Sequence, residues 1–332
     1  MRAVKVPREK AEEVRKYAEE IKAKDKKRLI VQKDDFVEIP IYDEYEKYFD
    51  YEIIEQENPL FAKEYDLTKI ISRKVPSHLH SFIPHKYKII GDIILIKIPS
   101  EMEEYRKRIG GTLLSIHPRC KSVWEDKGKK GMLRKPQVEL ISGEGSETIH
   151  REGGCYYKLD VTQVMFSPGN LAERMRAGRI VKDEEIVVDM FAGIGYFSIP
   201  AAVHSRPKRI YSIEANPQSY RYLLENIKLN KTKSIVPILG DSMFITPQGI
   251  ADRVFMGHIN SQDFLPVAVR ALREKGFIHY HESTPEAVLE RPVERVKRAA
   301  EKEGKKAEIE SFRKVKHYSP GVLHVVVDAC IS

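Results

Sequence analysis

The sequence has 332 residues, 42% of them hydrophobic, so the chain can bury a sizeable core in two or three globular domains. No stretch approaches the roughly 18 consecutive apolar residues of a membrane span, and the first residues lack the apolar segment of a signal peptide. These features exclude membrane insertion and secretion, and we expect a cytoplasmic protein. Cys120, Cys155 and Cys330 have no paired spacing, so we expect neither a disulfide framework nor a metal site.

The net charge of +8 and the isoelectric point near 9.1 favour a polyanionic partner, because basic side chains release counterions from nucleic acid when they bind it. Charged residues make up 32% of the chain, and such a surface also suits a heat-resistant protein that binds no nucleic acid. The charge alone leaves both interpretations open.

Residues 1–75 are predicted to form a small mixed α/β module. A charged helix is expected over 8–24, and a strand-like segment over 29–41. Residues 74–78 have the composition of a linker, which indicates a boundary between this module and the rest of the chain.

Residues 76–165 are predicted to form a middle α+β domain. Two β-branched runs flank Gly91 and Asp92, which is the signal of a β-hairpin. A basic loop is expected at 127–131. Further strands are expected near 112–117, 136–142 and 154–160.

Strands and helices alternate over residues 166–332, which predicts a parallel, doubly wound α/β sheet of the Rossmann-like kind. The best-supported helix covers 217–230 and has proline in its first turn. Two late extended segments, 310–319 and 322–331, are predicted to form an antiparallel pair at the edge of the sheet. The predicted parallel strands are 185–191, 209–215, 234–241, 253–258 and 277–283.

A glycine-containing turn follows the first of these strands. Asp189 lies near the end of the apolar run, and Gly193 and Gly195 let the backbone approach a ligand closely. A lone G-x-G pattern also occurs in ordinary strand-to-helix turns. A dinucleotide site is another alternative, but Ser198 stands where that motif places its third glycine.

Polar side chains also end the next two strands. Glu214 lies where a carboxylate can accept hydrogen bonds from both hydroxyls of a ribose, and Asp241 with Ser242 lies where an adenine would bind. Because the carboxyl ends of parallel strands meet at one edge of a sheet, these residues predict a nucleoside-binding crevice together with Asp189 and Gly193. The alternative for Glu214 alone is a helix cap, since a helix is expected to begin at about residue 217.

Eight segments between about residue 75 and the end of the chain form a more specific pattern: YKIIGDIILIKIP, VELISGEG, FSPGNLAERMR, VVDMFAGIGYFSIPAA, IEANPQSYRYLLENIKLN, DRVFMGHI, GFIHYHE and KVKHYSPGVLHVVVD. They resemble the joint family of tRNA guanine-37 N1-methyltransferases and wybutosine-synthesising aminocarboxypropyltransferases, in its archaeal form. Residues 1–75 resemble, more loosely, the small extra N-terminal domain of archaeal guanine-37 methyltransferases. The resemblance implies a class I S-adenosylmethionine-dependent transferase fold. It also implies S-adenosylmethionine as the donor substrate and the anticodon region of tRNA(Phe) as the partner, and we expect a monomer.

The two branches of that family differ in sequence, and this chain fits the aminocarboxypropyl branch, which has FSPGN, MG(H/Y) and IHYHE, at all three positions. Methyltransferases of the family carry SPR before the ERxR helix and NLP after the fourth strand, whereas this chain has SPGN from Ser167 and MGHI from Met256. The resemblance therefore implies transfer of the 3-amino-3-carboxypropyl group to C7 of 4-demethylwyosine. A guanine-37 N1-methyltransferase with a divergent loop is the first alternative. A non-catalytic tRNA-binding protein is the second.

By the same resemblance, Ser167 and Arg174 would complete the cofactor pocket. A serine near a helix start can exchange one hydrogen bond with a ligand, and an arginine offers a planar cationic fork to a carboxylate or carbonyl. The alternative for Arg174 is a surface arginine that pairs with Glu173 or with a phosphate. The alternative for Ser167 is an N-cap.

Three histidines are candidates for a general base, which is needed if the carbon nucleophile must lose its proton after attack. His279 and His281 lie on one strand and share a face. His258 lies in the turn after the fourth strand. The alternative is a buried strand end whose two histidines hydrogen-bond to the backbone.

Overall fold

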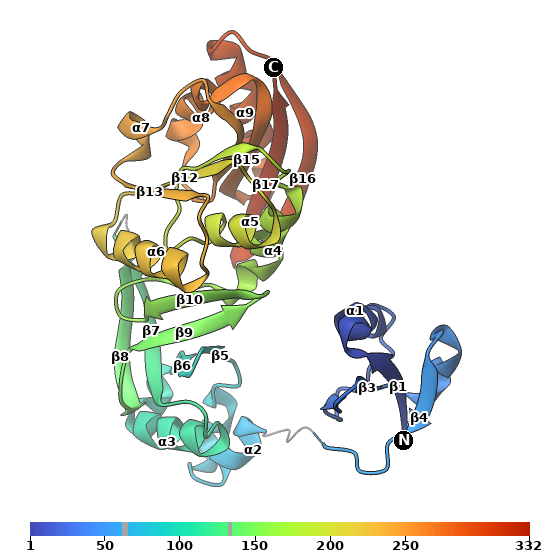
Figure 1. Ribbon diagram of the computed structural model, residues 1–332. Coiled ribbons are helices and arrows are strands. Elements are labelled where there is room, and N and C mark those ends of the chain that lie inside the picture. Colours follow the sequence, from blue (N-terminus) through green and yellow to red (C-terminus); the bar gives the residue numbers. More distant parts are fainter. Residues whose placement is uncertain (62–65, 132–134) are drawn as a thin grey trace. The chain divides into compact units, whose positions relative to one another are not determined.

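The computed structural model describes residues 1–61, 66–131 and 135–332. The chain forms two compact units, Met1–Ile70 and Ile71–Ser332 (Figure 1). Each unit has its own core, and the larger one contains every residue that the sequence suggests for a site.

The first unit is a four-stranded sheet in the order β2-β3-β1-β4, with a helix packed on one face. The predicted helix over 8–24 is shorter in the structure, because a 3-10 turn precedes α1. Val14 and Ala18 of α1 are buried against strand residues such as Ile39. The elements are β1 (Arg2–Pro7), α1 (Ala11–Glu20), β2 (Val31–Gln32), β3 (Phe36–Pro40) and β4 (Glu52–Glu55).

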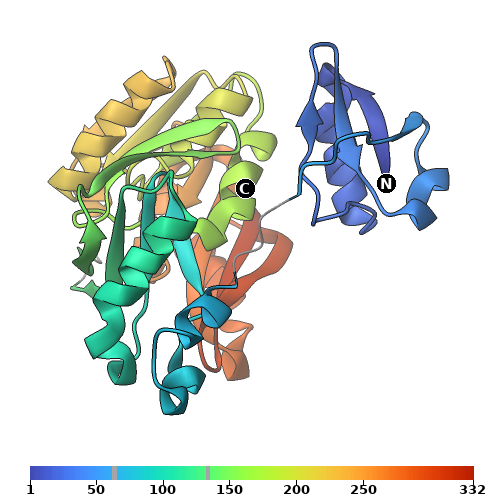
Figure 2. The same cartoon turned by 90° about the horizontal axis from the view of Figure 1, so that it is seen from below.

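The second unit begins near α2 (Leu67–Ser72) and continues into a sheet in the order β5-β6-β7-β8. The predicted hairpin at Gly91 is confirmed, and this glycine adopts a positive φ of 57°. Figure 2 shows α3, in teal, lying along the strands of this sheet. The elements are β5 (Tyr87–Ile90), β6 (Ile93–Ile96), α3 (Arg106–Ile116), β7 (Ser122–Lys130) and β8 (Lys135–Gly143).

Two predictions in this region are wrong. The strand expected near 112–117 is the end of α3, whose residues Ile109, Leu113 and Ile116 are buried on one face. A short apolar run fits a strand or a helix equally well, and only the residues before it reveal the helical spacing. The basic loop expected at 127–131 largely belongs to β7, which pairs with β8 as far as Lys130.

A second hairpin connects this sheet to the catalytic part of the unit. It consists of β9 (Glu147–Glu152), which the sequence did not indicate, and β10 (Cys155–Asp160), which was predicted. Asn226, fully buried on α6, accepts a hydrogen bond from Lys158 N at 2.6 Å and donates to Lys158 O at 3.2 Å and Ile194 O at 3.0 Å. One amide side chain therefore joins the hairpin, α6 and the turn after β11.

The last part of the chain is a seven-stranded sheet in the order β13-β12-β11-β14-β15-β17-β16. The first five strands in this order are parallel to one another, and β17 is antiparallel to both of its neighbours, β15 and β16. The predicted doubly wound sheet and its antiparallel edge pair are therefore confirmed. The strands are β11 (Ile186–Asp189), β12 (Arg209–Glu214), β13 (Ile235–Leu239), β14 (Ala251–Met256), β15 (Leu272–Pro285), β16 (Ala307–Ser319) and β17 (Val322–Ile331).

Helices cover both faces of this sheet, because alternate strand residues point to opposite sides. Val187 and Phe255 pack with α4, α5 and α6, whereas Val188 and Val254 pack with α8 and α9. The parallel strands end at the edge where α7 begins, and Glu214, Asp241 and Ser242 lie there. The helices are α4 (Leu171–Ile180), α5 (Ser198–His204), α6 (Pro217–Leu229), α7 (Ser242–Ile245), α8 (Leu265–Ala271) and α9 (Arg291–Lys302).

Replacing Asn226 with alanine should lower the free energy of unfolding by about 3 kcal/mol, because one buried and two partly buried backbone groups lose their partner. Asn230, one turn later, makes the same pair of bonds to Tyr156 N and O in an exposed position. Asn230→Ala is therefore the matched control. It should lower the free energy of unfolding by about 1 kcal/mol or less, since water replaces the lost amide. Chemical denaturation measures both values, and equal losses would contradict the role given to burial.

Candidate cofactor and transfer site

Asp189 holds the two ends of the turn that follows β11. Its Oδ2 accepts a hydrogen bond from Ser198 Oγ at 2.6 Å, and Ser212 Oγ donates to the same serine at 2.7 Å. Phe191 N donates to Oδ1 at 3.3 Å. Burial raises the pKa of Asp189 to about 6. Both carboxylate oxygens thus bond within the protein, so Asp189 shapes the turn; direct contact with a cofactor stays a prediction.

Glu214 joins the glycine turn to the start of α6. Its Oε2 accepts a hydrogen bond from Gly193 N at 2.7 Å, and its Oε1 accepts one from Asn216 N at 2.7 Å. Gly193 has a φ of 58°, and a Cβ at this position would lie 2.4 Å from the ring of Tyr196. A carboxylate offers about four acceptor positions, so Glu214 retains capacity for two more donors, such as the hydroxyls of a ribose. Burial raises its pKa.

The helix-cap alternative for Glu214 is not what the structure shows. Asn216 caps α6, because its side chain accepts from Gln218 N at 3.0 Å. Asp241 caps the short α7 by accepting from Met243 N at 2.9 Å, and its side chain lies at the surface. Ser242 is buried and its hydroxyl donates to Met190 O, which ties the end of the third strand to the first.

The candidates from the three strand ends therefore lie on one edge of the sheet, since β11, β12 and β13 are neighbours. That arrangement is the one expected of a nucleoside-binding crevice. The cofactor-binding roles themselves stay predictions.

Arg174 is 2% exposed and is held by groups from two other segments. Its Nε and Nη2 donate to the two carboxylate oxygens of Glu152 on β9, at 2.6 and 2.7 Å. Its Nη1 donates to Ser167 O at 2.9 Å, and the guanidinium lies 4.7 Å from the centre of the Phe166 ring. The alternative pairing with Glu173 is wrong, because that residue binds Arg313.

Ser167 is not a side-chain N-cap in this structure. Its hydroxyl instead accepts a hydrogen bond from Lys316 Nζ at 2.9 Å. Glu152 and Lys316 are functional candidates that the sequence did not suggest, because they lie 22 and 149 residues from the groups they bind. The KVKHYS motif contained Lys316, but only the fold assigns it a partner.

The strand histidines are buried, as the alternative has it, but they bond to neighbouring side chains where that alternative expects the backbone. His279 Nδ1 lies 2.6 Å from Asp328 Oδ1, and its Nε2 lies 2.7 Å from Arg253 Nη1. Since an arginine can only donate, this Nε2 accepts and the ring is neutral. His281 Nδ1 lies 3.0 Å from His324 Nε2. Burial lowers the pKa of His279 and brings that of His281 well below its usual range.

His258 is the most accessible of the three histidine candidates. It follows β14, its Nδ1 accepts a hydrogen bond from Asn260 N at 3.4 Å, and its ring centre lies 5.6 Å from that of Phe191. The assignment of a general base among these histidines stays a prediction.

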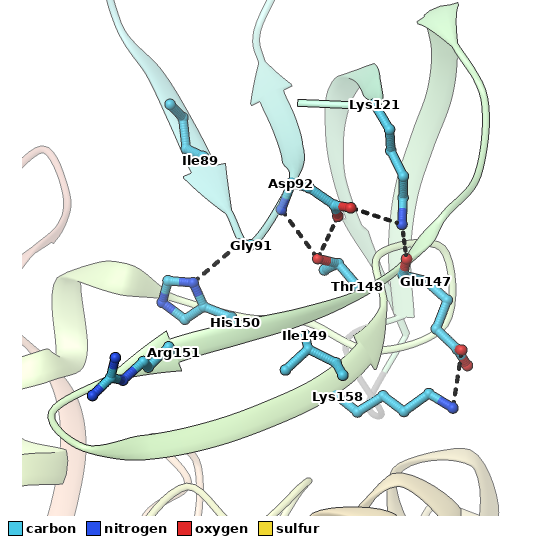
Figure 3. A pocket seen from close by; sticks show the side chains of 10 residues that line it. All are labelled: Ile89, Gly91, Asp92, Lys121, Glu147, Thr148, Ile149, His150, Arg151 and Lys158. Carbon is cyan, nitrogen blue, oxygen red and sulfur yellow. Dashed lines mark hydrogen bonds and ion pairs between the residues drawn. The ribbon is translucent and has the colours of Figure 1, made fainter. Parts of the chain in front are cut away.

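A cleft of about 720 Å³ lies elsewhere, between the β5–β6 hairpin and β9 (Figure 3). Lys121 Nζ bonds to Asp92 at 3.1 Å and to Glu147 O at 2.6 Å, and Thr148 Oγ1 donates to Asp92 at 2.6 Å. These bonds join the hairpin to the strand. The cleft is lined by Ile89, Gly91, Asp92, Lys121, Glu147, Thr148, Ile149, His150, Arg151 and Lys158, and the lining contains no residue predicted to bind the cofactor.

Comparison with known proteins gives a consistent assignment. Residues 148–310 match the TRM5/TYW2 methyltransferase domain, 67–146 match the TYW2 N-terminal domain, and 3–49 match the tRNA methyltransferase 5 N-terminal domain. A Methanocaldococcus jannaschii protein named tRNA(Phe) (4-demethylwyosine(37)-C(7)) aminocarboxypropyltransferase is 45% identical over 74% of this chain and 97% of its own length. The chain belongs to the TRM5/TYW2 family.

Members of the TRM5/TYW2 family with different names are similar to this chain. The Pyrococcus abyssi tRNA (guanine(37)-N(1))-methyltransferase Trm5b is 36% identical over 99% of both chains. The solved structure of Pyrococcus horikoshii TYW2 in complex with MeSAdo has a TM-score of 0.71 and 36% identity, and the match covers 80% of this chain and 97% of that one. The predicted class I transferase fold is confirmed by these likenesses.

No helix within residues 1–61, 66–131 and 135–332 is long and apolar enough to cross a membrane. In the same described part of the chain, histidine, cysteine, aspartate and glutamate side chains form no group of three that could hold a metal ion.

Replacing Glu214 with alanine should raise the dissociation constant for S-adenosylmethionine by roughly tenfold, because charge-assisted hydrogen bonds to the ribose are lost. Isothermal titration calorimetry measures this constant. Glu225→Ala is the control, since Glu225 lies on α6 and pairs with Lys158 and Arg221. An unchanged affinity in a folded Glu214 variant would refute the assignment.

Asp189 should make folding stability depend on pH. Its stabilising contribution is complete below the unfolded pKa of about 3.9 and is lost as the pH rises through about 6. Wild type should therefore gain about 1 kcal/mol in free energy of unfolding, relative to Asp189→Asn, when the pH falls from about 7.5 to about 5. Denaturant titrations at both pH values measure the difference. Parallel profiles for the two proteins would show that Asp189 is not the titrating group.

Proposed function

We propose that this protein transfers the 3-amino-3-carboxypropyl group of S-adenosylmethionine to C7 of 4-demethylwyosine at position 37 of tRNA(Phe). The relative that is 45% identical carries this activity in its name, and the match covers nearly all of that relative. The P. horikoshii relative whose structure contains MeSAdo belongs to the same branch by its name.

The turn after β14 is the observation that carries the choice of branch. A Cβ on Gly257 would lie 2.3 Å from the ring of Phe197, so this turn has no room for the asparagine of an NLP sequence. Phe197 is itself fixed, because it stacks on Phe255 with a ring separation of 5.6 Å. A group that polarises guanine from this position is therefore sterically incompatible with the packing.

Gly169 differs from Gly257 in its surroundings. Apart from its neighbours in the chain, only the side chain of Lys316 comes within 4 Å of the place where a Cβ on Gly169 would lie, among the described residues. A Cβ would make ordinary van der Waals contact there. Because this chain has no arginine at the position, that volume beside Ser167 is left for a transferred group larger than methyl.

The geometry of the sheet edge supports a proposed set of residues that would hold the donor. Gly193, Glu214 and Asp241 with Ser242 would bind the nucleoside, and Asp189 would support the turn. Ser167 and Arg174 would lie toward the transferred arm. S-adenosylmethionine supplies an electrophilic γ-carbon, methylthioadenosine leaves, and C7 of the base then loses its proton. The protein's task is to favour this carbon over the methyl group, which requires contacts that differ between the two transition states.

We also propose that the anticodon region of tRNA(Phe) binds beside this edge and that the enzyme acts as a monomer in the cytoplasm. The names of the relatives, which refer to position 37 of tRNA, support the first part. The positive net charge suits a polyanionic substrate.

The second candidate is a guanine-37 N1-methyltransferase, since the match to Trm5b covers 99% of both chains. Incubation with S-adenosylmethionine labelled in the methyl or in the carboxyl group distinguishes the two. Wild type should place carboxyl label on tRNA(Phe) that carries 4-demethylwyosine, and should leave unmodified guanine-containing tRNA without label. Methyl label on plain guanine would establish the second candidate instead.

A further inference from the structure

The conformation of β16 brings Lys316 to the α4 side of the sheet. Arg313 lies opposite Val326 and Lys316 lies opposite His324, with a register shift between Lys314 and Lys316. In a regular strand, residues three apart point to opposite faces. The extra residue in the bulge restores Lys316 to the face that Arg313 occupies, and bulges are known to re-aim side chains in this way.

Lys316 thereby joins a cluster of charged side chains between the β16–β17 edge and α4. The arginines there bind the neighbouring carboxylates: Arg174 binds Glu152, Arg176 binds Asp328, and Arg313 binds both Glu173 and Asp328. Lys316 adds an ammonium on the same face of β16 as Arg313.

The segment that Lys316 contacts lies against the predicted cofactor turn. Tyr196, in that turn, donates from its hydroxyl to Met165 O, and its ring centre lies 5.9 Å from that of Phe166. The same ring covers Gly193. Ser167 follows directly, and Lys316 Nζ lies 2.9 Å from its hydroxyl and 3.6 Å from the place where a Cβ on Gly169 would lie. A group extending from a nucleoside at Gly193 toward Ser167 would therefore reach Lys316.

We propose that Lys316 binds the carboxylate of the donor's 3-amino-3-carboxypropyl arm and so determines which carbon of the sulfonium faces the base. The inference rests on the proposed function. An ammonium on a flexible stem can follow the carboxylate while the arm moves from sulfur to the base, whereas the arginines of the cluster are fixed in bidentate pairs. Ser167 Oγ, which accepts from Lys316, orients the ammonium.

Calorimetry on the full-length protein tests this with S-adenosylmethionine, its decarboxylated form and methylthioadenosine. Lys316→Met should weaken binding of S-adenosylmethionine about tenfold. Binding of the other two compounds should change by less than about twofold, because neither contains the carboxylate. Lys316→Arg should recover most of the affinity. Lys314→Met is the matched control, since Lys314 pairs opposite Val325 on the other face of β16, and it should bind all three compounds as wild type does.

Two results would overturn the proposal. Equal weakening of all three compounds would show that Lys316 only supports the Ser167 segment. Unchanged binding of S-adenosylmethionine, with weaker tRNA binding and a shallower salt dependence, would show that Lys316 contacts an RNA phosphate. The proposed function fails separately, in the labelling experiment: methyl label on tRNA would exclude aminocarboxypropyl transfer, whatever group Lys316 binds.

Discussion

The buried ion pair between Arg174 and Glu152 is the interaction on which the candidate site depends. It connects β9 of the hairpin to α4 of the catalytic part, and the same guanidinium holds the backbone of Ser167. Burial alone would raise the pKa of Glu152, but bonds from His150 and Arg174 keep it below its usual value. Removing one partner of such a pair costs about 3–5 kcal/mol, because the other charge stays buried without compensation. The position of the Ser167 segment is therefore coupled to the folding of the hairpin.

The sheet and the polar residues grouped at one of its edges could be predicted from sequence because they depend on local patterns. Alternating strands and helices indicate a parallel sheet, and polar residues at strand ends then meet at one edge, as Glu214 and Asp241 do. The strand expected near 112–117 failed because a short apolar run has no distinctive period. Glu152 and Lys316 could not be found, since their partners are remote in sequence and a bulge in β16 changes the face on which Lys316 lies.

The strand histidines show a second reason why a sequence does not reveal the role of a side chain. His279 and His281 share a face as their spacing requires, but the sequence does not show what covers that face. In the structure Phe197, Phe255 and His324 surround them, and Asp328 binds His279. Burial alone would raise the pKa of Asp328, yet His279 and Arg313 hold it far below its usual range. A neutral imidazole between an arginine and a carboxylate is thus a structural connector between β14, β15 and β17.

The irregularity of β16 also matters for the outer edge of the sheet. β16 is an edge strand, and its pairing with β17 shifts register at three places along its length. A second sheet could add to this edge only through a long, even row of free amide and carbonyl groups. The bulges interrupt that row, and Arg313, Lys314 and Lys316 add charge to it. The bulged strand that re-aims Lys316 therefore also protects the chain against edge-to-edge aggregation.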